Sequence, residues 1–167
     1  DQLHTLQPFP RAARFEIQMV RAVIEARGER YGYKLLSRKE ETGPRDVRER
    51  LGLGDDARLL HLRCLHSAVG RPFQIEDRWI NLDVLPAARL TDFSDTGPNE
   101  WLVQTVPYSE VEIRIRAMAA TGTLAKQLVV QDGTAIVTTL RTTWLDGQAL
   151  THVRLHFHDG YEFVTRY

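Results

Sequence analysis

The chain has 167 residues and a mass of 19.2 kDa, a size that fits one domain and leaves little room for two independent cores. Apolar residues make up 43% and charged residues 26%, so the chain can bury a core and is unlike a disordered segment. Lys and Arg number 22, as do Asp and Glu. This balance disfavours nucleic-acid binding by this chain alone, because a module held by phosphates normally carries a basic excess.

The single cysteine, Cys64, cannot form an internal disulfide, and without a second one there is no cysteine-type zinc framework. No apolar run approaches the roughly 20 residues that cross a bilayer, and residues 1–10 lack the basic start and apolar stretch of a secretion signal. We therefore expect a cytoplasmic protein without a metal or other cofactor. The chain begins with Asp1 rather than Met, as an excised part of a longer protein would.

Hydrophobic periodicity predicts an α+β fold. Apolar residues recur at helical spacing over residues 15–26, and Gly28 follows as the stop. Shorter helices or helical turns are expected at residues 44–51, 84–90, 99–103 and 123–129. Alternating apolar and polar residues predict strands at residues 31–37, 59–66, 72–80, 111–118, 134–144 and 148–157. The expected architecture is a mainly antiparallel sheet with flanking helices.

Residues 59–66 and 72–80 are predicted to form a β-hairpin around a turn at residues 69–70. Counting outward from this turn places Arg63 opposite Glu76 and His61 opposite Arg78, so one face is polar. The other face is apolar apart from Asp77 and carries Leu62, Cys64, Phe73, Ile75 and Trp79.

The second hairpin is centred on Asp146-Gly147, a dipeptide that favours a type I′ turn. The same counting places Arg141 opposite His152 and Thr139 opposite Arg154. One face of this hairpin is then expected to carry Arg141, His152, Arg154 and His156.

The sequence has no phosphate loop, dinucleotide fingerprint, zincin motif or serine-hydrolase elbow, so the common enzyme classes lose their usual support. His152, His156 and His158 alternate along a strand and could approach a metal. No further ligand completes a shell, which favours a plain polar strand face. The arginines of both hairpins can hold a carboxylate or phosphate through parallel hydrogen bonds, or can form exposed ion pairs. The sequence pattern alone does not decide between anion binding and exposed ion pairs.

Residues 72–81, PFQIEDRWIN, resemble the corresponding run in the effector-binding (UTRA) domain of GntR-type bacterial repressors, particularly their histidine-utilisation subgroup. Further segments agree in the same order along the chain, at residues 15–17, 25–28, 51–53, 63–66, 99–102, 140–144 and 153–161. The Glu-Asp-Arg run at residues 76–78 is the most specific part of this resemblance.

The resemblance implies a chorismate-lyase-like fold, a homodimer, and an N-terminal winged-helix domain that reads DNA. Residues 1–14 are then the linker from that DNA-binding domain, which this chain lacks, and residues 15–167 are the UTRA domain. The subgroup's effector is urocanate, a small carboxylate whose binding releases the full-length repressor from its operator. The alternatives are an effector that is another small acid or a sugar phosphate, a domain that only dimerises, and a chorismate-lyase-like enzyme, which fold analogy alone supports.

By matching positions to the family, the effector pocket is expected to be formed by Arg63, Glu76, Asn99, Trp101, Arg141, Arg154 and His156. Arg63 or Arg154 would hold the carboxylate and Glu76 the imidazole N–H, while Trp101 would supply a flat wall. A supporting layer around these residues is expected from Arg78, His152 and Tyr161. No residue is assigned a catalytic role, since a sensor rather than an enzyme is expected.

Overall fold

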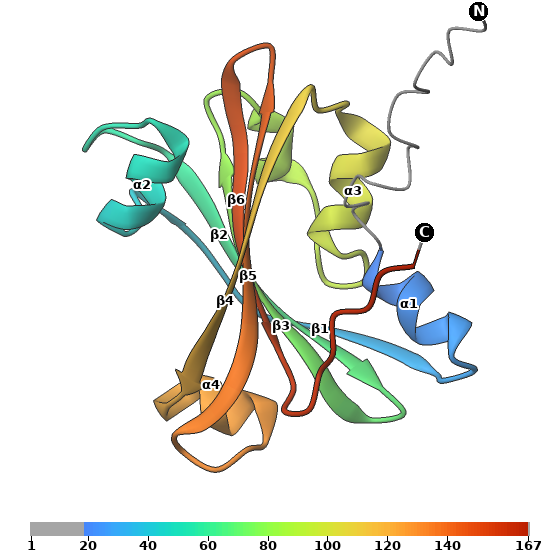
Figure 1. Cartoon of the computed structure of the whole chain (residues 1–167). Coiled ribbons are helices and arrows are strands. Elements are labelled where there is room, and N and C mark those ends of the chain that lie inside the picture. Colours follow the sequence, from blue (N-terminus) through green and yellow to red (C-terminus); the bar gives the residue numbers. More distant parts are fainter. Residues whose placement is uncertain (1–18, 167) are drawn as a thin grey trace, which may run out of the picture.

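The computed structural model describes residues 19–166 and places six strands in one antiparallel sheet (Figure 1). The strands are β1 (Tyr31–Glu41), β2 (Leu59–Ala68), β3 (Arg71–Asn81), β4 (Glu110–Ala120), β5 (Thr134–Leu145) and β6 (Gln148–Phe157). Their order across the sheet is β1-β2-β3-β6-β5-β4, so β1 and β4 form the two edges. The α+β class with an antiparallel sheet is confirmed.

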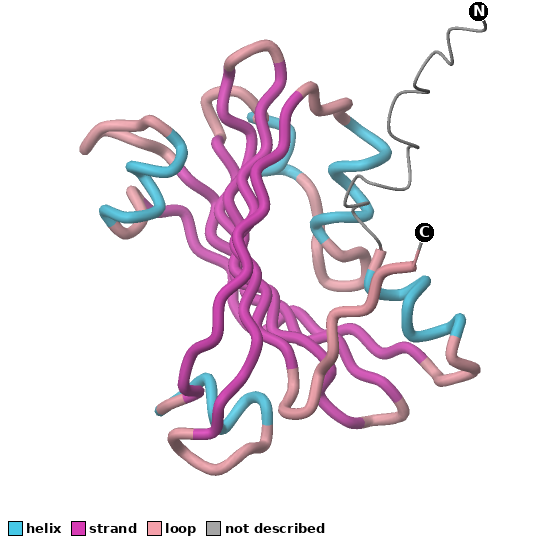
Figure 2. Tube along the Cα trace, viewed as in Figure 1, coloured by secondary structure: helices cyan, strands magenta, loops and turns pink. Residues whose placement is uncertain are grey.

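The helices are short and lie on both sides of the twisted sheet (Figures 1 and 2). They are α1 (Val20–Ala26), α2 (Arg45–Leu51), the 3-10 helix η2 (Pro86–Leu90), α3 (Pro98–Thr105) and α4 (Gly122–Leu128). Met19 has an extended backbone, so the first helix begins at Val20, and the predicted helical residues 15–18 lie outside the described residues. No helix within residues 19–166 is long and apolar enough to cross a membrane.

The two faces of the sheet bury separate cores. On the first face, defined by Leu62 and Cys64 of β2, apolar residues of the η2 and α3 region such as Phe93 and Leu102 complete one cluster. The second face is defined by Ile75 and Trp79 of β3, against which α2 and α4 pack with the apolar side chains Val47, Leu51, Ala125 and Leu128. Each face therefore has helices that can enclose side chains between sheet and helix.

The first hairpin contains a bulge that shifts its register. Its turn at residues 69–70 forms as predicted, with positive φ at both positions. Phe73 is an extra residue of β3, however, and every later pair moves by one position. Arg63 consequently lies opposite Asp77, so the predicted pairing of Arg63 with Glu76 is wrong.

This shift also exchanges the faces of β3, because a one-residue slip turns every side chain to the other side. His61 lies opposite Trp79, so its predicted pairing with Arg78 is wrong. Glu76 and Arg78 point to the first face, and Asp77 and Trp79 to the second. The predicted division into one polar and one apolar face is therefore wrong as well.

The second hairpin has the same kind of irregularity. The turn at residues 146–147 is confirmed, but Leu150 is an extra residue of β6 close to it. Arg141 lies opposite Val153 and not opposite His152. The bulge thus moves the polar residues of β5 relative to those of β6.

The predicted pairing of Thr139 with Arg154 is wrong for the same reason, since Arg154 lies opposite Leu140. Directly opposed residues share a face, and neighbours along a strand point to opposite faces. Arg141 therefore belongs to the first face, with Val153. The second face keeps the other three predicted residues, His152, Arg154 and His156.

Two imidazoles of β6 are buried in the second face. His152 and His156 are 3% and 6% exposed, and their Nδ1 atoms lie 2.8 Å from the Thr142 hydroxyl and 2.9 Å from the Thr138 hydroxyl. Burial lowers the pKa of each from the ordinary value of 6.5 to about 4, and neighbouring cations such as Arg154 act in the same direction. Both side chains are neutral at pH 7.

We predict that mild acid weakens the fold through these two histidines. Between pH 6.5 and about 4 the unfolded chain binds protons on both imidazoles and the folded chain does not. The free energy of unfolding should therefore fall as pH decreases through this window, by up to about 3 kcal/mol for each histidine. Urea unfolding curves across the window measure this slope. The variant His156→Gln should have a shallower slope than the parent, and an unchanged slope would contradict the assignment.

Candidate functional site

Four of the predicted site residues meet on the first face: Glu76, Arg78, Asn99 and Arg141. Glu76 and Arg78 stand two residues apart on β3, so their side chains point to one side. Arg141 comes from β5, two strands away across the sheet. Asn99 lies in the first turn of α3, and the side chains of Asn99 and Arg141 are hydrogen-bonded. Strand and helix together therefore enclose a cluster of charged groups.

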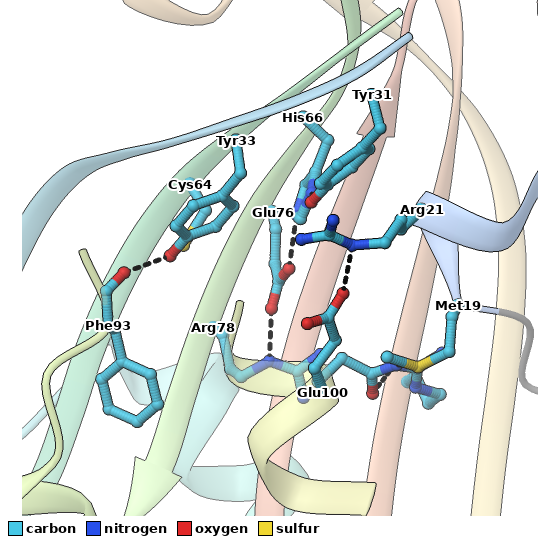
Figure 3. Close-up of polar contacts among 12 residues, drawn as sticks. Met19, Arg21, Tyr31, Tyr33, Cys64, His66, Glu76, Arg78, Phe93 and Glu100 are labelled. Atoms are coloured by element: carbon cyan, nitrogen blue, oxygen red, sulfur yellow. Dashed lines mark hydrogen bonds and ion pairs between the residues drawn. The ribbon is translucent and has the colours of Figure 1, made fainter. Parts of the chain in front are cut away.

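Glu76 is 2% exposed and accepts hydrogen bonds on both carboxylate oxygens (Figure 3). Nε of Arg78 donates at 2.6 Å and Nε2 of His66 at 2.8 Å. Burial alone would raise the pKa of this carboxyl, but Arg78 and His66 outweigh burial and lower the pKa to about 2. Glu76 and Arg78 thus form a buried pair with no net charge.

Arg141, by contrast, is a buried cation without a carboxylate partner among the described residues. It is 8% exposed. One terminal nitrogen donates to Oδ1 of Asn99 at 3.0 Å, while the buried Nε has no hydrogen-bond partner within residues 19–166. Burial lowers the pKa of this guanidinium to about 10, and the neighbouring Arg78 acts in the same direction. A buried, uncompensated charge is costly, so this group is suited to an anion.

A small cavity opens beside the two guanidinium groups. Apolar side chains of α3 and the segment after it form one wall, and hydroxyl groups of β5 and β6 contribute polar atoms. The lining residues are Arg78, Asn99, Leu102, Val103, Val106, Tyr108, Arg141, Thr143, Leu150 and Thr151. The cavity volume is about 20 Å³, which is room for about one water molecule.

Two residues of this cluster were missed by the sequence analysis: His66 and Tyr31. The ionised Glu76 only accepts, so Nε2 of His66 carries a hydrogen, and Nδ1 accepts from the Tyr31 hydroxyl at 2.7 Å. This chain of bonds joins β1, β2 and β3 and orients the carboxylate toward Arg78 (Figure 3). His66 lies within the run 63–66 that resembles the family, but no residue type in that run marks it as a partner of Glu76.

Asn99 and its neighbour Glu100 also connect the cluster to α1. While Oδ1 of Asn99 accepts from Arg141, its Nδ2 lies 3.0 Å from the Met19 sulfur. Nε of Arg21 donates to Glu100 at 3.0 Å (Figure 3). The first turn of α3 therefore touches both the unpaired guanidinium and the beginning of α1.

The other charged candidates lie on the opposite side of the sheet: Arg63, His152, Arg154 and His156. Arg63 lies 3.2 Å from Asp77, and Arg154 donates to Asp46 at 2.6 Å. Each of these cations thus has an acidic partner, which Arg141 lacks. The two histidines bond to threonines, as described above. The expected pocket of seven residues is consequently divided between two faces.

The two aromatic candidates take part in apolar packing outside the cavity lining. Trp101 is on α3, but its ring packs edge-on against Phe93, with the ring centroids 5.6 Å apart. Tyr161 stacks on Phe157 at 3.8 Å, within the cluster that includes Ile24 of α1. Neither side chain lines the cavity beside Arg141.

The predicted site residues are divided between the two faces of the sheet because of the two bulges. The sequence contains one weak signal for a bulge. Pro72 stands next to the extra residue Phe73, and proline inside a paired strand is typical of edges and bulges. No comparable signal accompanies Leu150 in β6. Apart from Asn99, the cavity residues of α3 and the adjoining segment were also missed, because apolar side chains such as Leu102 and Val103 carry no sequence signal that distinguishes a cavity wall from a core.

The chain is similar to known proteins in both sequence and fold. The UTRA domain family profile matches residues 26–163. The chain is 29% identical over 154 residues to the histidine utilization repressor of Pseudomonas putida and 27% identical over 151 residues to that of Klebsiella aerogenes. These matches cover 92% and 90% of this chain but 62% and 63% of the relatives. The chain therefore spans less than two thirds of their length.

Among solved structures, the C-terminal domain of the histidine utilization repressor from Pseudomonas syringae is similar, with a TM-score of 0.77 and 28% identity. The match covers 83% of this chain and 99% of that one. The effector domain of PhnF from Mycobacterium smegmatis shares the fold at 17% identity, with a TM-score of 0.79 and coverage of 92% and 96%. Since the family profile spans all six strands and the unpaired arginine, the chain belongs to the UTRA domain family.

Proposed function

We propose that this chain is the ligand-sensing domain of a bacterial repressor of histidine utilisation, and that it binds a small carboxylate at Arg141. Urocanate is the first candidate, and its binding would release the full-length repressor from operator DNA through a separate DNA-binding domain. The observation that carries the proposal is that the buried guanidinium has no counterion in the part of the chain that the structure describes. The relatives are named as repressors, which implies a regulator rather than an enzyme.

The charge balance favours a carboxylate over a sugar phosphate. Glu76 neutralises Arg78 through a 2.6 Å hydrogen bond, so only the charge of Arg141 remains to be compensated. A carboxylate supplies one negative charge and two acceptor oxygens for a guanidinium, whereas a phosphate monoester approaches two negative charges at neutral pH. A single anionic charge therefore matches the site.

Polar and apolar groups around Arg141 suit the rest of such a ligand. Val103 and Val106 supply an apolar wall. Thr143 and Thr151 line the cavity and lie 3.0 Å apart through their hydroxyl oxygens, and these oxygens can accept from an imidazole N–H. Glu76, the group expected from the sequence, already accepts from two donors and serves to hold Arg78.

Ligand binding would require α3 to move, because the cavity has room for about one water molecule. A carboxylate at Arg141 would replace the Asn99 carbonyl oxygen, which now accepts from the guanidinium. Asn99 and Glu100 also hold Met19 and Arg21. Displacement of this turn would therefore loosen α1, next to residues 1–18, which precede it in the chain. We propose this as the route by which ligand binding reaches the preceding domain.

A homodimer, as the family resemblance implies, is the assembly we propose for the repressor. The sheet ends in two edge strands, β1 and β4, and an edge strand left open is a site of further pairing. Light scattering of the chain should give about twice its 19.2 kDa mass for a closed two-fold pair.

We predict that Arg141→Met abolishes carboxylate binding while Arg154→Met does not. Removing the guanidinium takes away a charge-assisted pair of hydrogen bonds and should weaken urocanate binding by about 2–3 kcal/mol or more. Arg154 is the matched control, since it is a strand arginine on the opposite face that is already paired with Asp46. Isothermal titration calorimetry with urocanate measures both variants.

Three results would contradict this proposal. Arg141→Met could bind urocanate like the parent, Arg154→Met could lose binding, or the parent could bind a sugar phosphate and no imidazole acid. The variant Asn99→Asp provides an independent test, because it places a carboxylate next to Arg141, at the residue whose side chain now accepts from it. It should remain folded and compete with the ligand, so that urocanate binding is lost.

We also predict that the site and α1 are coupled. Urocanate should speed amide hydrogen exchange over residues 19–26 in the parent, because it releases the contacts of Asn99 and Glu100. Glu100→Gln removes the ion pair with Arg21 and should speed exchange there without ligand. Glu49→Gln, which removes the exposed pair with Arg45, is the control. Unchanged exchange in α1 upon binding would contradict the route.

A further inference from the structure

Among residues 19–166, strand β4 forms one edge of the sheet and pairs with β5 alone. It is eleven residues long, and its central part is largely exposed, including Arg114, Arg116 and the 47% exposed Ile115. An edge strand of this length presents unpaired backbone N–H and C=O groups to any second strand. Its side chains therefore decide which partner fits.

The sequence of β4 is complementary to itself when reversed. It reads Glu110-Val111-Glu112-Ile113-Arg114-Ile115-Arg116, with acidic residues before Ile113 and basic residues after it. An antiparallel copy centred on Ile113 places Glu112 opposite the partner's Arg114 and Glu110 opposite the partner's Arg116. Val111 then lies opposite the partner's Ile115. Every charge meets its opposite, and every apolar residue meets an apolar residue.

We infer that β4 is the dimer seam, where two copies of this chain pair antiparallel about Ile113 into one continuous sheet. This inference rests on the dimer proposed above and names its surface. Opposite charges directly across an antiparallel pair stabilise it, and like charges destabilise it. A register centred on Arg114 or Glu112 places like charges together on the two-fold axis. The charges therefore select Ile113 as the centre.

The face assignments agree with this pairing. Glu112 and Arg114 lie opposite Thr142 and Leu140 of β5 and so belong to the second face of the sheet. Ile113 lies opposite Arg141 and belongs to the first face. A two-fold axis perpendicular to the sheet keeps these faces aligned between the copies. Charged residues then meet on one side of the seam and apolar residues on the other.

The pair of Glu112 with Arg114 already exists within one chain, at 2.9 Å, and Arg50 lies 3.9 Å from Glu112. Charges on an edge strand can also serve to block pairing. Blocking does not require that acidic and basic residues be arranged symmetrically about one apolar residue. An experiment that exchanges these charges separates the two roles.

The experiment uses two variants of the chain in analytical ultracentrifugation. Arg114→Glu with Arg116→Glu makes the strand all acidic, and Glu110→Arg with Glu112→Arg makes it all basic. Each should associate with itself at least about tenfold more weakly than the parent, because like charges then face each other across the seam. An equimolar mixture of the two should form a one-to-one heterodimer.

The matched control is Lys34→Glu with Lys39→Glu on β1, the opposite edge, which changes the net charge as much as the acidic variant does. It should dimerise like the parent. Circular dichroism confirms that all variants are folded. A monomeric parent, variants that still dimerise, or a mixture that stays monomeric would overturn the inference. No ligand is used, so these outcomes are independent of whether the domain binds a carboxylate.

Discussion

Glu76 can neutralise one guanidinium, yet both Arg78 and Arg141 are buried near it. Its two oxygens are occupied by Arg78 and His66, each at hydrogen-bond distance. Both oxygens of the Glu76 carboxylate are therefore already bonded to residues of the sheet. The guanidinium of Arg141 donates instead to the amide oxygen of Asn99. An amide oxygen carries only a partial charge, so the charge of Arg141 is poorly compensated in the structure. That deficit is the driving force for the anion binding that we propose.

The poorly compensated charge of Arg141 also explains how the proposed anion site can be coupled to α1. In the position that α3 has in the structure, Oδ1 of Asn99 accepts a hydrogen bond from Arg141, and the cavity beside it has room for about one water molecule, so a ligand cannot occupy the same place. The anion binding that we propose and this position of α3 therefore exclude each other. A ligand shifts a conformational equilibrium only if it binds the two conformations with different affinity. An anion that binds Arg141 only after α3 has moved meets this condition. The contacts with Met19 and Arg21 extend the shift to α1.

The sequence was sufficient for the strands, the helices and the two hairpin turns, because these depend on local periodicity and on the positive φ of residues such as Asp146 and Gly147. It was insufficient for the site, because one extra residue in each hairpin decides which face a side chain occupies. Arg141 and Arg154 were expected on the same face of the second hairpin and lie on opposite faces. Residue type alone could not separate them, since only partner geometry shows that Arg154 is paired and Arg141 is not.

The proposed seam and the proposed site lie on adjacent strands. Ile113, at the centre of the seam, is directly opposite Arg141, and Val111 is opposite Thr143 of the cavity. Any repositioning of Arg141 by a ligand acts on the β5 backbone and, through the β4–β5 pairing, on the strand that meets the partner. Coupling between two binding equilibria is reciprocal, so a ligand that tightens or loosens the dimer has its own affinity changed by dimerisation to the same extent. In the proposed dimer, a small anion at Arg141 would therefore lie one strand away from the seam.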